Sequence, residues 1–264
     1  MNYYVHDLSP MAVEWGWFIL PWYWLSYIAG FFIVYFGVMS LSSKKKITLS
    51  KKLIHDYLSI GFLSLVLGGR IGYILIYNLG YYLKEPMKVF ALWEGGMSFH
   101  GAIIGIGLYT FYQSRKYKVP FLTFTDAISI FAPIGIFFGR ISNFINGELA
   151  GRVTDVPWAV IFPKFYNGEP RHPSQIYEAL LEGLTLFLIL FFFGRNKLNR
   201  RGFCTGLFVS FYGFFRFVIE FFRSPDPQIG LYFGIFTMGQ FLCGVMIIIG
   251  VIIILKSDEE VSSL

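Results

Sequence analysis

The chain has 264 residues, of which 14% are charged and 55% are hydrophobic. Because a soluble globular domain carries about 25% charged residues, this composition excludes an ordinary soluble domain and indicates a surface that faces lipid. The formal net charge is +6, but the basic residues lie in short loops between apolar segments, which is typical of a membrane topology signal and argues against a nucleic-acid partner.

Seven apolar segments follow one another along the chain, and each is long enough, or nearly so, for a helix that crosses the hydrocarbon core of a bilayer. They are residues 22–41, 57–77, 97–112, 124–144, 176–193, 203–222 and 231–255. The third is the shortest and is interrupted by glycines. We therefore predict an all-α polytopic membrane protein with seven transmembrane helices, folded as a single membrane-embedded domain over residues 1–264.

The loops predict how these helices are oriented. The first, third and fifth loops carry most of the basic residues, namely Lys44, Lys45, Lys46, Lys51 and Lys52, then Arg115, Lys116 and Lys118, then Arg195, Lys197, Arg200 and Arg201. In the second and sixth loops, acidic residues such as Glu94 and Asp226 offset the basic ones. By the positive-inside rule, the three basic loops are cytoplasmic, so the N-terminus is outside and the C-terminus is in the cytoplasm.

The fourth loop, residues 145–174, is the longest and is rich in Gly, Pro and aromatic residues. Loops of this length are usually either functional or disordered. Its aromatic content favours an ordered cap on the outer membrane face.

Ionisable residues inside the apolar segments point to a site, because charge within a bilayer is costly and is usually retained for function. With the predicted orientation, they share one depth in the outer half of the membrane. They are Arg70, His100, Arg140, Arg216, Glu220 and Arg223, with Tyr23 at the start of the first segment and Glu178 and Glu182 at the start of the fifth. The planar arginine fork suits phosphate oxygens, so the implied ligand is a phospholipid headgroup.

Local spacing places several of these residues on shared helix faces. Arg216, Glu220 and Arg223 are four and three residues apart, and Arg140 and Asn143 are three apart. The alternative for the first group is an Arg–Glu–Arg lattice that only neutralises itself. No metal-ligand spacing, Walker loop or nucleophile motif stands out, so we expect neither a metal nor another cofactor.

Residues 139–152 read GRISNFINGELAGR and resemble the signature of the prolipoprotein diacylglyceryl transferase family, which has the pattern G-R-x-G-N-F-x-N-x-E-x-x-G. Ser142 departs from that pattern, which has a small Gly or Ala there. Further matches to the family are residues 68–73, 93–101, 171–178 and 216–223, in order and over nearly the full length.

This resemblance implies an enzyme of the bacterial cytoplasmic (inner) membrane with its active site toward the outer face. Such an enzyme transfers the diacylglyceryl group of phosphatidylglycerol to the lipobox cysteine thiol in the signal peptide of a prolipoprotein. A thioether forms and glycerol 1-phosphate leaves, which is the first step of lipoprotein maturation. The implied partners are phosphatidylglycerol, the prolipoprotein and membrane lipid.

The expected catalytic residues are Arg140 and Arg216, which would bind the phosphate, and His100, which would take the thiol proton or orient the headgroup. Glu148 would orient Arg140 or take a proton. The expected substrate-binding residues are Tyr23, Arg70, Asn143, Asn146, Gly151, Glu220 and Arg223. Among these, Arg70 has a structural alternative, Asn146 has turn chemistry beside Gly147 as its alternative, and Glu220 would position the two neighbouring arginines.

Two other classes remain open from the residues alone. A lipid transporter or scramblase also needs a cationic pocket, although the inner halves of the segments hold few charges. A structural or receptor protein could use the arginines only to bind outer-leaflet lipid. Formation of a labelled thioether from phosphatidylglycerol and a lipobox peptide separates an enzyme from both.

Overall fold

The computed structural model describes residues 2–259, apart from residues 17, 45, 92–94, 225–230 and 233–235. Lys45, Glu94 and Asp226, together with the first two residues of the 93–101 match, lie outside the described residues. The chain divides into two compact units, a larger one of residues 1–38 and 125–264 and a smaller one of residues 39–124. The prediction of one membrane-embedded domain stays a prediction.

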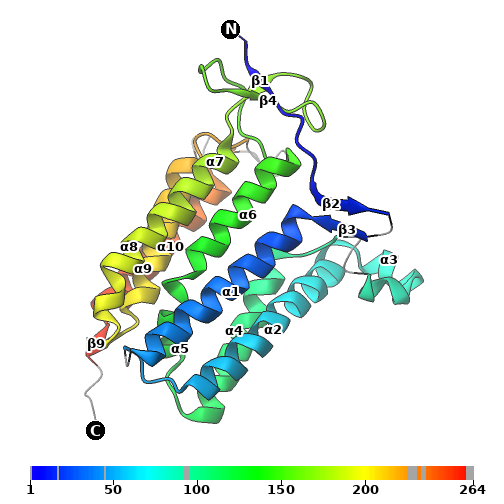
Figure 1. Ribbon diagram of the computed structural model, residues 1–264. Coiled ribbons are helices and arrows are strands. Elements are labelled where there is room, and N and C mark those ends of the chain that lie inside the picture. The colour runs from blue at the N-terminus through cyan, green and yellow to red at the C-terminus, as the bar shows by residue number, and fades with distance from the viewer. Residues whose placement is uncertain are drawn as a thin grey trace. The chain divides into compact units, whose positions relative to one another are not determined.

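The larger unit is a helix bundle. Its helices are α1 (Trp22–Ser43, whose last turn belongs to the smaller unit), α5 (Phe121–Ser129, whose first turn does so too), α6 (Ala132–Asn146), α7 (Ser174–Glu178), η3 (Ala179–Thr185), α8 (Leu186–Phe192), η4 (Gly194–Lys197), α9 (Phe203–Ile219) and α10 (Met238–Leu255). Figure 1 shows α6, α8, α9 and α10 running side by side.

A break divides the predicted helix of residues 124–144. Helices α5 and α6 meet at an angle of 52°. Pro133 lies in the first turn of α6, where its missing N–H and its ring prevent one helix from continuing through this point. The prediction of one unbroken helix was therefore wrong here, although both halves are helical.

The fifth segment is continuous from Ser174 to Phe192, but its middle part, η3, is a π-helix. In a π-helix the hydrogen bonds skip one more residue than in an α-helix, and such turns are often found at functional sites. Gly183 allows this wider turn to pack on α6, because a Cβ atom there would lie 2.6 Å from the Cβ of Phe137.

The last two helices are shorter than predicted. Helix α9 ends at Ile219, and α10 begins at Met238 rather than at residue 231. The Thr237 side chain caps α10 by accepting a hydrogen bond from the backbone N–H of Gln240 at 3.1 Å, which fixes the first turn there. At the N-terminal end of α9, the buried Asp126 carboxylate accepts hydrogen bonds from the backbone N–H groups of Gly202 and Thr205, at 2.6 and 2.7 Å.

Short strands lie in the segments outside the helices and form small separate sheets. They are β1 (Tyr4–Val5), β2 (Met11–Trp15), β3 (Phe18–Pro21), β4 (Val160–Ile161), β5 (Pro170–Arg171), β6 (Arg200–Arg201), β7 (Leu231–Tyr232), β8 (Phe236–Thr237) and β9 (Asp258–Glu259). Strand β1 pairs in parallel with β4, which pairs antiparallel with β5. Strands β2 and β3 form an antiparallel hairpin that leads into α1.

The fourth loop is folded around the β1–β4–β5 sheet and has its own small core of Ala150, Val160 and Phe162. His6 belongs to this region and is 3% exposed between the rings of Phe144 and Phe162. Pairing of β1 with β4 carries the N-terminal segment, and with it His6, into this core. That the loop is an outer-face cap stays a prediction.

The smaller unit contains α2 (Lys51–Tyr77), α3 (Leu79–Lys84), η1 (Pro86–Phe90) and α4 (Phe99–Tyr117). Helices α2 and α4 pack through glycines. A Cβ atom on Gly68 would lie 2.5 Å from the carbonyl oxygen of Gly101, and one on Gly72 would lie 2.7 Å from the Gly101 Cα. Such close backbone contact through small residues is characteristic of helix pairs in membranes.

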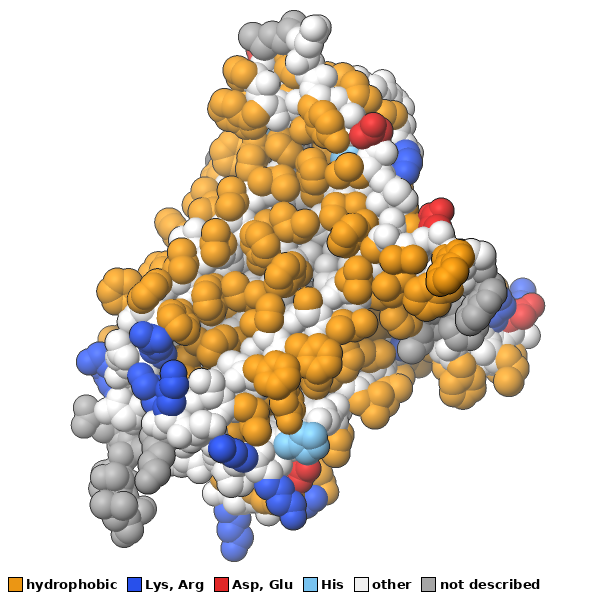
Figure 2. Space-filling model, in the orientation of Figure 1, with side chains coloured by type: hydrophobic (Ala, Val, Ile, Leu, Met, Phe, Trp, Pro, Cys, Tyr) orange, Lys and Arg blue, Asp and Glu red, His pale blue; other side chains and the backbone are white. Residues whose placement is uncertain are grey.

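The surface of the helices has the character of a membrane protein. Four helical stretches (α1, α2, residues 174–192 and α10) are long and apolar enough to cross a bilayer, and the bent α5–α6 pair would be a fifth. Helix α9 is apolar but has only 17 residues. Hydrophobic side chains cover much of the face that Figure 2 shows, and many large hydrophobic residues of the helices are exposed. The chain is thus a helical membrane protein, with helix in each predicted segment, whereas the count of seven spans and their orientation stay predictions.

Candidate active site

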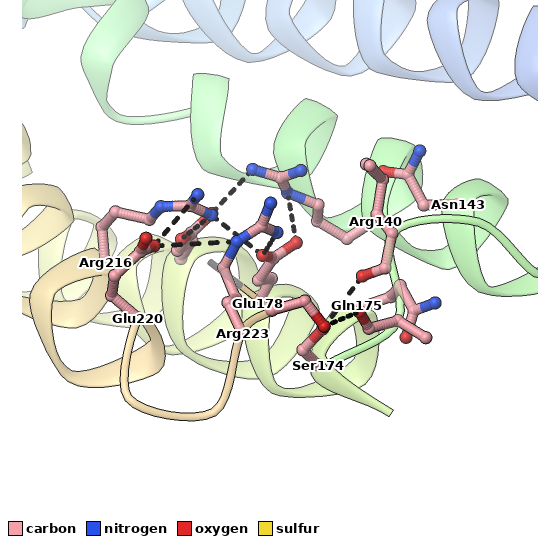
Figure 3. Close-up of polar contacts among 12 residues, drawn as sticks. Arg140, Asn143, Ser174, Gln175, Glu178, Arg216, Glu220 and Arg223 are labelled. Carbon is pink, nitrogen blue, oxygen red and sulfur yellow. Dashed lines mark hydrogen bonds and ion pairs between the residues drawn. The ribbon is translucent and has the colours of Figure 1, made fainter. Parts of the chain in front are cut away.

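Six charged side chains meet at one end of the bundle in the larger unit (Figure 3). We call them the charge cluster. Its members are Arg140 from α6, Glu178 from α7, Glu182 from η3, Arg216 from α9, and Glu220 and Arg223 just after α9.

Glu178 lies at the centre of the charge cluster and contacts all three arginines. Its Oε2 lies 3.1 Å from Nε of Arg140, and its Oε1 lies 2.9 Å from Nη1 of Arg216. Oε1 also contacts Nη1 of Arg223. The contacts with Arg216 and Arg223 are charge-assisted hydrogen bonds, and the contact with Arg140 is an ion pair. Glu178 thus links α6, α7 and the end of α9.

Glu182 contacts two of the same arginines. Its Oε2 lies 3.2 Å from Nη2 of Arg140, and its Oε1 lies 3.6 Å from Nη1 of Arg216. Arg140 and Arg216 therefore share two carboxylates, although they are far apart in the sequence. The π-helix begins directly after Glu178 and contains Glu182, so it sets the angle between the two carboxylates.

Glu220 contacts the guanidinium groups of Arg216 and Arg223 near the end of α9. Its Oε2 lies 3.4 Å from Nη2 of Arg216 and 3.7 Å from Nε of Arg223. The structure thus brings Arg216, Glu220 and Arg223 together as the helical spacing predicted.

Burial separates the two signs of charge in the cluster. The three arginines formally balance the three glutamates, but the side chains of Glu178 and Glu182 are 0% exposed, whereas those of the arginines are 18–21% exposed. Among the described residues, Nη1 of Arg140 and Nη2 of Arg223 have no hydrogen-bond partner. The carboxylates therefore contact the arginines on the buried side of the cluster. The opposite edges of the guanidinium groups stay accessible to an anion.

A second group of polar residues lies next to the cluster on α6. The Asn143 amide donates to the Tyr23 hydroxyl at 2.6 Å and to Oε1 of Glu148 at 2.8 Å. Asn146 donates to the same Glu148 oxygen at 3.4 Å. Gly147, with φ +78°, ends α6 in the left-handed conformation that glycine adopts readily, and this turn brings Glu148 back beside Asn143.

Gly151 of the fourth loop contacts both His172, just before α7, and Phe222, the residue before Arg223. Its N–H donates to the His172 carbonyl at 2.9 Å, and a Cβ atom would lie 2.3 Å from the Phe222 carbonyl oxygen. The following Arg152 donates from Nε to the Arg223 carbonyl at 2.7 Å. No side chain fits at Gly151, and the backbone of Arg223 is held from the fourth loop.

His172 precedes α7 in this same region. Its ring packs against Phe222 and Tyr177, with centroids 5.2 and 5.9 Å apart, and burial lowers the pKa of its imidazole below the usual 6.5. The neutral ring that results can accept a hydrogen bond from the Tyr177 hydroxyl, whose oxygen lies 3.1 Å from Nδ1. His172 thus adds no positive charge near neutral pH.

Arg70 lies in the smaller unit and is 3% exposed. All five of its N–H groups have backbone carbonyl acceptors. These are Val89 at 3.0 Å, Gly95 at 2.5 Å, Gly96 at 3.2 Å, Lys88 at 2.6 Å and Ala91 at 3.1 Å. The donors of Arg70 are therefore already used by the segment that leads into α4.

His100 is the second residue of α4 and is exposed. Ser98 caps this helix by accepting from the Gly101 N–H at 3.2 Å. The prediction that His100 and Arg70 share one depth with Arg140 and Arg216 concerns both units and stays a prediction.

Reasoning from the sequence placed Glu178 and Glu182 at the depth of the site but gave them no role. Their spacing of four residues within an apolar segment was the available signal. Ser142 also gains a partner, because its hydroxyl lies 2.5 Å from that of Ser26 on α1. This contact accommodates the serine that departs from the family pattern.

The fold and the site together define a class, the helical membrane proteins with a buried, charge-balanced arginine–glutamate cluster open to an anion. Comparison with known proteins is more specific. The family model described as "Prolipoprotein diacylglyceryl transferase" matches residues 10–256. The chain belongs to this family.

Several relatives named phosphatidylglycerol–prolipoprotein diacylglyceryl transferase are similar over nearly their full length. The protein from Geobacter sulfurreducens is 48% identical, covering 92% of this chain and 93% of the relative. The protein from Aeromonas hydrophila is 45% identical, covering 94% and 90%. The one from Rickettsia typhi is 42% identical, covering 96% and 98%.

Proposed function

We propose that this chain transfers the diacylglyceryl group of phosphatidylglycerol to the cysteine thiol of a prolipoprotein, as the names of its relatives state for those proteins. One observation supports this most directly. Arg140 and Arg216, from different helices, share two fully buried glutamates and keep guanidinium surface accessible.

In this reaction the cysteine sulfur loses its proton and attacks the glyceryl carbon that bears the phosphate. The S–C bond forms, the C–O bond breaks, and glycerol 1-phosphate leaves with the bonding electron pair. Arg140 and Arg216 bind the phosphodiester and stabilise the charge that develops on the leaving oxygen. Cations held in place before the reaction, as these are by Glu178 and Glu182, make the largest electrostatic contribution.

The second polar group is suited to the glycerol headgroup. Tyr23, Asn143 and Glu148 form one connected set of hydrogen bonds, whose donors and acceptors match glycerol hydroxyls. Asn146 supports Glu148, so its role combines turn chemistry with positioning. Arg140 is held by Glu178 and Glu182, which leaves Glu148 free to bind the headgroup or take a proton rather than orient Arg140.

Glu220, Arg223 and Gly151 act around this centre. Glu220 positions Arg216 and Arg223, and Arg223 adds positive charge at the edge of the site. Gly151 permits the close backbone contact beside Arg223. For Arg70 we propose the structural role, because its five donors hold the segment before α4.

His100 is our proposed base for the thiol, because an imidazole nitrogen can accept a proton. Replacing His100 by Gln should lower kcat most at neutral pH and less at high pH, where the thiol ionises without help. Glu148→Gln is the matched comparison. If Glu148→Gln shows this pH-dependent loss and His100→Gln does not, the base is Glu148.

We place the enzyme in the bacterial inner membrane with seven spans, the N-terminus outside and the site toward the outer face. Helix α4, the α5–α6 pair and α9 would complete the seven spans beyond the four long apolar stretches. Labelling of single cysteines placed in the fourth loop and in the first loop, with a reagent that does not cross the membrane, tests this orientation. Labelling of the first loop alone would indicate the opposite orientation in the membrane.

The activity is tested with purified protein, phosphatidylglycerol carrying labelled acyl chains, and a peptide with a lipobox cysteine. The expected product is a labelled thioether that resists hydroxylamine. A peptide with serine in place of the cysteine is the control. Lipid binding or lipid movement without a thioether would instead favour a transporter or a lipid-binding protein.

A further inference from the structure

The Glu220 carboxylate has a second set of contacts that the reaction described above does not use. Its Oε2 faces Arg216 and Arg223. Its Oε1 accepts a hydrogen bond from the Thr237 hydroxyl at 3.1 Å. The two oxygens are thus divided between the arginines on one side and the first turn of α10 on the other.

The Thr237 hydroxyl has both of its hydrogen-bonding roles assigned. It accepts from the Gln240 N–H at 3.1 Å, while the Gln240 side-chain oxygen accepts from the Thr237 N–H at 3.0 Å. This reciprocal pair is a capping box. Because the hydroxyl accepts from Gln240, its own hydrogen is available to donate to Glu220, which as a carboxylate can only accept.

Gly239 provides the space for this arrangement. A Cβ atom at Gly239 would lie 2.9 Å from Oε1 and 3.0 Å from Cδ of Glu220. The carboxylate therefore lies where any other residue would have its side chain. It also lies at the N-terminal turn of α10, where the helix dipole favours a negative charge.

We infer that Thr237 and Gly239 are positioning residues of the transferase. The N-terminal turn of α10 fixes the Glu220 carboxylate, and Glu220 in turn fixes the guanidinium groups of Arg216 and Arg223. This inference rests on the proposed function, since Arg216 matters only if it binds the phosphate. It gives α10, which contributes no residue to the charge cluster, a part in aligning the site.

Gly239→Ala tests the inference, with Gly244→Ala as its matched control. Both glycines lie in α10, and a Cβ atom at Gly244 meets nothing within 4 Å. In Gly239→Ala the new methyl group collides with the end of a flexible side chain, so the helix folds and the Glu220 carboxylate moves. We expect kcat to fall about tenfold or more with a smaller change in KM, whereas Gly244→Ala stays within about twofold of the parent protein.

Three variants of Thr237 separate positioning from helix capping. Thr237→Ser keeps the cap and the donor and should retain transfer. Thr237→Asp keeps a good cap but cannot donate to Glu220 when ionised, so we expect a folded protein with strongly reduced kcat. Thr237→Val removes both functions and should lose stability as well as transfer.

The outcomes distinguish this inference from the proposed function. If the parent protein makes no thioether, the proposed function fails before the variants are compared. If the parent protein transfers and Gly239→Ala matches Gly244→Ala, or Thr237→Asp transfers as well as Thr237→Ser, then the turn only caps the helix and the positioning role is overturned.

Discussion

Arg70 in the smaller unit and Arg140 in the larger one are the same residue type in similar apolar helices, but their surroundings differ. Arg70 donates all five N–H groups to backbone carbonyls and is 3% exposed. Arg140 contacts two carboxylates, and its side chain is 21% exposed. Arg70 orders a chain segment. The charge of Arg140 is balanced by buried carboxylates, and part of its side chain stays exposed.

The acceptors therefore distinguish these two arginines, although both lie in apolar helices. Carbonyl acceptors use up the donors of Arg70 without neutralising its charge. Carboxylates neutralise Arg140 and Arg216 while leaving donors for a phosphate.

Arg140→Lys should lower kcat for transfer by about 100-fold or more, because lysine keeps the charge but loses the planar fork that contacts Glu178 and Glu182 and that we propose binds the phosphate. Lysine is preferable to alanine here. Alanine would deprive two buried carboxylates of a partner, which costs about 3–5 kcal/mol of stability. Thioether formation and the melting temperature in detergent are measured together. Transfer within threefold of the parent would remove Arg140 from the site.

Arg70→Lys should mainly lower stability. Lysine has three donors for five carbonyl acceptors, so the free energy of unfolding should fall by about 3 kcal/mol. The KM for phosphatidylglycerol should stay unchanged in the protein that remains folded. A raised KM at unchanged stability would instead make Arg70 a lipid ligand, as the sequence first suggested.

Asp126→Asn should destabilise the fold by about 1–3 kcal/mol, because the amide nitrogen would face one of the backbone N–H groups that the carboxylate now accepts. Glu14→Gln, at an exposed residue of β2, is the control for the change from acid to amide. Thermal unfolding is the measurement. Equal melting temperatures for the two variants would show that Asp126 does not hold the end of α9.

Ser142→Ala should have the smallest effect. It removes the hydrogen bond to Ser26, which should lower the free energy of unfolding by about 1 kcal/mol and leave transfer within about twofold. A double-mutant cycle with Ser26→Ala isolates the pair. A coupling near zero would mean that the serine is tolerated only for its size.

Much of this arrangement could be predicted from the sequence because it depends on local spacing. Arg216, Glu220 and Arg223 are four and three residues apart, and this spacing predicts the contacts that they make. The positions of the apolar segments follow in the same way, since the length of each run decides where a helix can form.

The remaining features depend on contacts between distant segments. The partners of Glu178 come from α6 and α9, and the π-helix forms where Gly183 packs against Phe137. Likewise, Thr237 donates to Glu220 although the two residues are 17 positions apart in the sequence. Sequence spacing carries no information on such pairings, so Glu182 and Thr237 received no role from the sequence.

The length of α9 has a consequence for how the substrate reaches the site. The helix is held by Asp126 at its first turn and by the charge cluster at its last, and it has 17 residues, which gives a length of ~26 Å. A hydrocarbon core is ~30 Å thick, so if α9 is a span, as proposed above, one of its ends lies inside the core unless the bilayer thins around it. If that end carries Arg216, a lipid phosphate bound there would lie deeper than the neighbouring headgroups, away from bulk water that would compete with a thiol.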